Sequence, residues 1–287
     1  MHALMIRLSI AVTALSLVAS FANCQDSSST TESVSLFNGK DLSGWVGRSD
    51  LWSVEDGQIV GRTVADKPLE QNSFLIYTGS EPTNFELTLD FKIENTNSGI
   101  QYRSKILDRE KFVVGGYQAD IDFTNRFAGI LYEEKGRGIL AERGQSTTID
   151  ASGEKTRKKF ADGRALGNGI HPGEWNEYRI VAKGNHLQHF INGAMTAEVF
   201  DNQSDKSASS GVIAFQLHRG DPMVVRFKNI VLHPVQSQYG SHDRPIAVRF
   251  AGAGTRRFER KLPVGPPMAK SIWATDAKTE TLLEAAR

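Results

Sequence analysis

The stretch that decides the fold spans residues 97–133 and reads NSGIQYRSKILDREKFVVGGYQADIDFTNRFAGILYE. Two runs in it, 99–103 and 117–122, carry polar residues at every second position, and a third run, 215–218, repeats the pattern. Because successive side chains of a strand point to opposite faces, each run predicts a polar stripe on one face of a strand. The polar residues of the three runs are Gln101, Arg103, Gln118, Asp120, Asp122, Gln216 and His218.

These polar stripes have two interpretations. An antiparallel sheet with its outer face in water would produce them. Such faces usually carry Thr, Lys, Glu and Ser, whereas these runs carry Gln, Arg, Asp and His. We therefore favour a second interpretation, in which the three strands are neighbours and line one polar cleft. Alternation assigns each stripe to a face, but it does not show that the strands are adjacent.

Strand-like patterns continue over residues 36–235, where no helix of normal length is evident. Residues 84–94 alternate apolar and polar side chains, and hairpin turns are expected at Asp56-Gly57 and Asn192-Gly193. Ten or more strands with glycine turns predict an antiparallel sandwich or barrel, and a polar groove favours a curved jelly roll. The further expected strands are 74–77, 129–133, 175–183, 186–191, 194–200, 211–218 and 223–234.

Residues 136–168 interrupt this pattern. They are rich in Gly, Lys and Arg and show little periodicity. We predict a long loop here, with one helical turn within 154–164. A long loop inside a compact domain is often functional.

The N-terminal residues 1–23 are predicted to be a signal peptide. An apolar run at 8–22 follows a weakly basic start, and Ser20 and Ala22 supply small residues for cleavage. Cys24 follows as a candidate lipid-attachment site, although its flanking residues fit a lipobox poorly. It is the only cysteine, so no intrachain disulfide can form. We expect export to the periplasm or the cell exterior.

The remaining boundaries follow from composition. Residues 24–33 are a polar linker, 34–235 form the folded domain, and 236–287 form an irregular C-terminal tail without an independent domain. Lys plus Arg number 34 and Asp plus Glu number 33, for a net charge of +1. This balance gives no argument for a nucleic-acid partner or an anionic membrane surface.

A series of short motifs in order resembles one exported bacterial family, the 3-keto-glycoside lyases or hydratases, formerly a domain of unknown function. The resemblance covers residues 34–235 and implies an all-β, antiparallel, concanavalin-like jelly-roll sandwich with a carbohydrate substrate. The motifs are LFNGKDLSGW at 36–45, WSVEDGQIVG at 52–61, NSGIQYR at 97–103, GYQADID at 116–122, GILYE at 129–133, GEWN at 173–176, ING at 191–193 and FKNI at 227–230.

The resemblance implies a sugar that carries a ketone at carbon 3. A base removes the acidified proton from carbon 2, the enolate expels the group on carbon 1, and water then adds. Many family members carry Glu in the segment matching 116–122, where this chain has Gln118 and Asp120. The base therefore remains open between Asp120 and His218. Arg103 is either an oxyanion clamp or a salt-bridge partner of a nearby aspartate.

The other candidate site residues are expected to bind substrate. Gln101, Gln118 and Gln216 suit sugar hydroxyls because an amide both donates and accepts. Asp122, Tyr132, Glu133 and Arg143 complete the set. A divalent metal is a candidate cofactor, with Asp120, Asp122, Glu133 and His218 as candidate ligands, but no compact ligand motif is present.

Two other functions stay open. A non-catalytic carbohydrate-binding module uses the same fold. A conventional glycosidase needs two carboxylates, which Asp120 and Asp122 could supply. The sequence does not determine the aglycone, the anomer or the oligomeric state.

Overall fold

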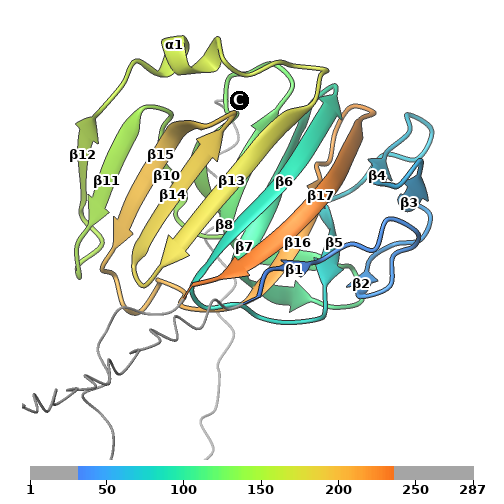
Figure 1. The fold of residues 1–287 in the computed structure, drawn as a ribbon, viewed down its shortest axis with the longest axis horizontal. Helices are drawn as coiled ribbons and strands as arrows, with labels where there is room; N and C mark the ends of the chain where they lie inside the picture. The colour runs from blue at the N-terminus through green and yellow to red at the C-terminus, as the bar shows by residue number, and fades with distance from the viewer. Residues whose placement is uncertain (1–31, 236–287) are drawn as a thin grey trace, which may run out of the picture. The chain divides into compact units, whose positions relative to one another are not determined.

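A computed structural model describes residues 32–235, which form two stacked β-sheets (Figure 1). The ten-stranded sheet contains β1 (Val34–Ser35), β3 (Trp52–Glu55), β4 (Gln58–Arg62), β6 (Phe85–Glu94), β11 (Gln145–Ile149), β12 (Lys155–Lys159), β13 (Asn176–Lys183), β14 (His186–Ile191), β15 (Ala194–Asp201) and β17 (Val224–Pro234). The seven-stranded sheet contains β2 (Trp45–Val46), β5 (Ser73–Tyr77), β7 (Asn97–Asp108), β8 (Val113–Asp122), β9 (Leu131–Glu134), β10 (Gly138–Ala141) and β16 (Val212–Leu217).

The strand order confirms the predicted all-β sandwich of jelly-roll type. One sheet runs β12-β11-β15-β14-β13-β6-β17-β4-β3 with β1 beside β17, and the other runs β10-β9-β8-β7-β16-β5-β2. Among the described strands, every pair is antiparallel except β11 with β15. The expected turns at Asp56-Gly57 and Asn192-Gly193 both have positive φ values, as tight hairpins require.

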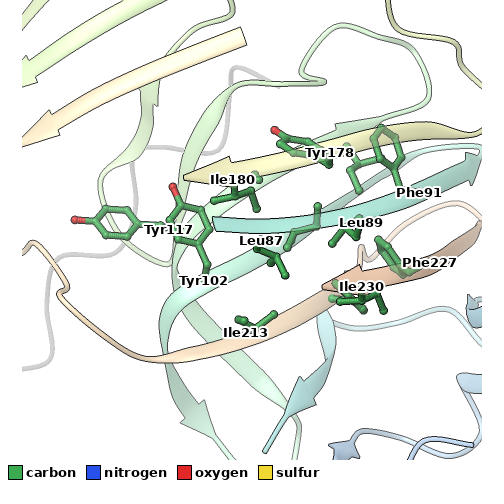
Figure 2. Close-up of a cluster of buried hydrophobic side chains, with 14 of the residues drawn as sticks. Leu87, Leu89, Phe91, Tyr102, Tyr117, Tyr178, Ile180, Ile213, Phe227 and Ile230 are labelled. Atoms are coloured by element: carbon green, nitrogen blue, oxygen red, sulfur yellow. The ribbon is translucent and has the colours of Figure 1, made fainter. Parts of the chain in front are cut away.

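The core lies between the sheets. The alternation of apolar and polar residues along the strands predicts which side chains form it. Each apolar residue of β6 from Phe85 to Ile93 is at most 2% exposed, and the residues between them are partly exposed. Figure 2 shows Leu87 and Leu89 of β6 beside Ile180 of β13. Burying one such side chain contributes about 1.5–3 kcal/mol, so this core is the main source of stability.

The prediction of a long loop over residues 136–168 is wrong. The segment forms β10, β11 and β12, followed by a five-residue helix, α1 (Gly163–Gly167). Strand β12 reads KTRKK, and its side chains are mostly exposed. It pairs with β11 through a continuous antiparallel register. An exposed edge strand needs no apolar face, so hydrophobic alternation could not reveal it.

The helical turn expected within 154–164 is also displaced. Helix α1 begins after Asp162, whose carboxylate accepts hydrogen bonds from the N–H groups of Arg164 and Ala165. This N-cap explains why the helix starts at Gly163. Among residues 32–235, no helix has the length and apolar character needed to span a membrane. The predicted signal peptide, Cys24, nearly all of the linker and the tail from residue 236 lie outside the described residues.

Candidate active site on the seven-stranded sheet

Strands β8, β7 and β16 are neighbours in the seven-stranded sheet, which confirms the adjacency on which the predicted cleft depends. Gln101 lies opposite Gln118 on one side and opposite Ala214 on the other. The alternating residues Tyr102 and Tyr117 point into the core (Figure 2). The glutamines therefore occupy the face that points away from the core, which we call the outer face.

Three glutamines on the outer face are hydrogen-bonded to one another. Gln101 Nε2 donates to Gln118 Oε1 at 2.6 Å, and Gln216 Nε2 donates to the same oxygen at 3.1 Å. Gln118 Nε2 donates to Asp120 Oδ1 at 2.6 Å. All three amides are almost fully buried, so they are placed to orient Asp120 rather than to face a sugar directly.

Asp120 has the electrostatics of an acid–base group. Its side chain is 6% exposed, and burial raises the pKa of its carboxyl to about 8. The charges of Glu134 and Asp122 act in the same direction on this pKa, while the hydrogen bonds from Gln118 and Asn97 oppose them. A carboxyl with a pKa near neutrality can both take and return a proton at physiological pH.

Glu134 is a site carboxylate that the sequence analysis missed. Across β8 and β9, Gln118 pairs with Tyr132 and Gly116 pairs with Glu134, so Tyr132 and Glu134 share the outer face. Asn72 Nδ2 donates to Glu134 Oε1 at 3.1 Å. Counting by twos from Tyr132 would have selected Glu134 instead of Glu133.

The prediction that Glu133 lines the cleft is wrong for the same reason. It pairs with Tyr117 and points toward the core side, where Arg137 donates to it at 2.6 Å. Arg137 also binds Asp201, and Tyr117 donates to the same carboxylate at 2.6 Å. These residues form an ion-pair network between the sheets.

The prediction that Arg103 shares the cleft with Gln101 is also wrong. Arg103 has a φ of 47°, and the β7–β8 register shifts between Tyr102 and Lys105. This bulge turns the side chain off the polar stripe. The guanidinium donates to the carbonyl oxygens of Thr83, Gly184 and Ala208, which belong to three separate loops. It makes no ion pair with Asp120 or Asp122, so neither proposed role holds.

Asp122 and Arg143, two further candidates, are hydrogen-bonded mainly to nearby backbone groups. The Asp122 carboxylate accepts hydrogen bonds from Thr124 and from the N–H groups of Arg126 and Phe127. Arg143 donates to the carbonyl oxygens of Gly163, Ala128 and Asn125 and to the Asn125 side chain. Both residues shape the loops beside the site instead of facing an open cleft.

His218 follows the last residue of β16, at the rim of the outer face. Its Nδ1 lies 2.5 Å from the carbonyl oxygen of Arg219, whose N–H donates to Asn72. No hydrogen bond joins His218 to Asp120. His218 and Tyr132 are the candidates that remain partly exposed.

The four candidate metal ligands do not converge. Glu133 faces the core side and the Asp122 carboxylate is occupied by the 124–127 loop. Within residues 32–235, no group of three or more His, Cys, Asp or Glu side chains is arranged to hold a metal ion. This donor set does not fit a metal centre.

Comparison with known families now adds to this geometry. Residues 32–233 match the family described as the 3-keto-alpha-glucoside-1,2-lyase-like domain. The chain belongs to this family. Membership supports a carbohydrate-active function and a carbohydrate partner. No curated protein sequence matches the chain.

Solved structures are similar at the level of the fold. A candidate glycosyl hydrolase from Parabacteroides distasonis is 22% identical, with 71% of this chain and 100% of that chain covered and a TM-score of 0.48. A Bacillus subtilis protein of unknown function with a galectin-like fold is 12% identical, with 72% and 97% covered and a TM-score of 0.48. The carbohydrate-binding module CBM66 from Bacillus subtilis is 14% identical, with 65% and 93% covered and a TM-score of 0.43.

Proposed function

We propose that this protein cleaves 3-keto-glycosides by elimination followed by addition of water. The observation that carries the proposal is Asp120, a buried carboxyl on the outer face with a pKa raised to about 8. Removal of a proton beside a ketone needs a base of this strength held in a fixed position. Family membership supports a carbohydrate substrate, and the family's description motivates the choice of a 3-keto-glycoside.

The proposed reaction begins when Asp120 takes the proton from carbon 2 and the electron pair passes to the ketone oxygen as an enolate. The enolate then expels the substituent on carbon 1, which leaves with the proton that Asp120 returns, and water adds across the new double bond. The enolate oxygen needs a hydrogen-bond donor. Arg103 lies on the core side and does not supply this donor.

A conventional glycosidase is a weaker alternative. It requires two carboxylates that flank the glycosidic bond. The Asp122 carboxylate accepts hydrogen bonds from the 124–127 loop, and Glu134, the other carboxylate of the outer face, accepts one from Asn72. A binding module would not need a buried carboxyl of raised pKa.

The test compares a 3-keto-glucoside with the corresponding plain glucoside. We expect cleavage of the keto sugar alone, with an unsaturated sugar detectable early in the reaction. Asp120→Asn should lower turnover roughly 100-fold or more, since a positioned acid–base group contributes about that much. Cleavage of the plain glucoside, or full activity of a folded Asp120→Asn protein, would overturn the proposal.

We also propose that the protein is exported after cleavage near residues 22–23. The apolar run at 8–22 and the small residues before Cys24 support this. Mass spectrometry of the native protein would show the shortened N-terminus, with added lipid mass if Cys24 is acylated. An intact Met1 in the native host would contradict export by this route.

A further inference from the structure

The side-chain amide of Gln118 is hydrogen-bonded through both of its polar atoms. Its oxygen accepts from Gln101 and Gln216, and its nitrogen donates to Asp120. Gln101 is bonded in turn to Ser104, whose Oγ lies 2.6 Å from Gln101 Oε1. The three glutamines therefore form one chain of hydrogen bonds that ends at Asp120.

The neighbouring strand leaves room for this amide. Gly99 pairs with Asp120 across β7 and β8. A Cβ atom at Gly99 would lie 2.5 Å from Cγ and Cδ of Gln118 and 2.8 Å from its Nε2. The φ of Gly99 is outside the left-handed region, so its backbone does not require glycine. Gly99 therefore serves a specific purpose, because its missing side chain leaves the space that the Gln118 amide occupies.

We propose that Gln118 is a positioning residue that holds Oδ1 of Asp120 and so orients the carboxylate that receives the proton from the substrate. This inference rests on the proposed function. In the reaction, the carbon 2–hydrogen bond breaks, the proton bonds to the Asp120 carboxylate, and the electron pair moves to the ketone oxygen.

The hydrogen bond from Gln118 to Asp120 is important because the neighbours of Asp120 are charged. Glu134 from β9 and Asp122 from β8 both favour the neutral acid, and Tyr178 from β13 lies on the core side with a pKa raised far above neutrality by burial. The hydrogen bond from Gln118 is the largest influence that favours the ionised base. Without it, Asp120 would ionise only at higher pH.

The first experiment is Gln118→Met, which preserves length and apolar packing but removes the amide. With a 3-keto-glucoside we expect kcat to fall about tenfold or more and KM to change by less than about threefold. The rise of the rate with pH should move to higher pH. A folded Gln118→Met protein with wild-type kcat and an unchanged pH profile would overturn the inference.

A second variant, Gly99→Ala, tests the same geometry without removing a polar group. The added Cβ displaces the Gln118 amide, so kcat and the pH profile should change in the same direction. Gly169→Ala is the matched control, because its Cβ would make only an ordinary contact with Leu166 O. Equal activity of the two alanine variants would contradict the proposed positioning.

A double-variant experiment separates positioning from general structural support. In an Asp120→Asn background, Gln118→Met should cause no further loss of turnover. An equal loss in both backgrounds would show that Gln118 acts on structure alone. If Gln118→Met does not fold, Gln216→Met replaces it, since this variant removes one of the two donors to Gln118 and should shift the pH profile less.

The two proposals fail in distinguishable ways. An inactive Asp120→Asn protein beside an unaffected Gln118→Met protein would overturn the positioning role and leave the proposed reaction intact. A fully active Asp120→Asn protein would overturn both.

Discussion

Asp120 illustrates how one side chain acquires a function from its surroundings. In the sequence it is one of several alternating polar residues, whereas in the fold it is buried beside two other acids and a glutamine donor. Burial disfavours the charged form and raises the pKa.

The rate of the proposed reaction should therefore depend on pH through Asp120. Since the base must be deprotonated, kcat/KM should rise with pH and level off above about 8, the pKa of this carboxyl. Steady-state rates with a 3-keto-glucoside between acid and alkaline pH measure this dependence. A plateau already reached near the ordinary aspartate pKa would contradict it.

Arg103 illustrates the opposite case, a residue with apparent chemistry and a structural use. Its guanidinium joins loops around Thr83, Gly184 and Ala208. Arg103→Met would remove the charged donor from these partly buried carbonyl oxygens, and a hydrogen bond to a charged group contributes about 1.5–3 kcal/mol. We expect a total loss of about 3 kcal/mol or more in chemical denaturation.

The matched variant Arg103→Lys keeps the positive charge but not the planar set of donors. It should recover only part of the stability. A loss of turnover at unchanged stability in either variant would return Arg103 to the active site.

At the level of elements, β12 shows how a sheet edge is protected. Among the described strands, it pairs with β11 alone and is the last strand of its sheet. Lysines and arginines on such an edge discourage pairing with another molecule. This explains why the strand lacks apolar alternation and was mistaken for a loop.

Replacing Arg157 and Lys158 with threonine should therefore promote association, because threonine favours strands and removes the repulsion. Light scattering against protein concentration measures the effect. The control is Arg164→Thr with Lys206→Thr, which removes the same charge from exposed positions outside the strands. Equal behaviour of the two double variants would indicate a net-charge effect only.

At the scale of the whole molecule, the candidate site costs stability. The pKa of Asp120 is raised from 3.8 to about 8 on folding, so the folded protein holds this proton more tightly than the unfolded chain. The stabilisation of the folded protein by this tighter proton binding is fully present below about pH 4 and is lost as pH rises through 8. His189 acts in the opposite sense, because burial lowers its pKa from 6.5 to about 3, and its contribution is lost as pH falls toward 3.

Asp120→Asn should consequently stabilise the protein relative to the wild type, and the gain should grow from about pH 4 to pH 8. The difference in unfolding free energy between the two proteins isolates Asp120 from the other titrating groups. A gain that is constant with pH would contradict the raised pKa.

Local patterns were sufficient for the β-sandwich, the hairpin turns and the outer-face assignment of Gln101, Gln118, Asp120 and Gln216. Period-two alternation and glycine turns are local properties, and motif order was sufficient for the family, which the match over residues 32–233 confirms. Only the tertiary structure placed β7, β8 and β16 side by side, since pairing depends on contacts between distant segments. It also showed that a bulge turns Arg103 away from the outer face, and that the β8–β9 register places Glu134 on this face and Glu133 on the core side. The bulge leaves no local signal, because it is decided by how neighbouring strands share their hydrogen bonds, whereas alternation from Tyr132 already places Glu134 on the outer face.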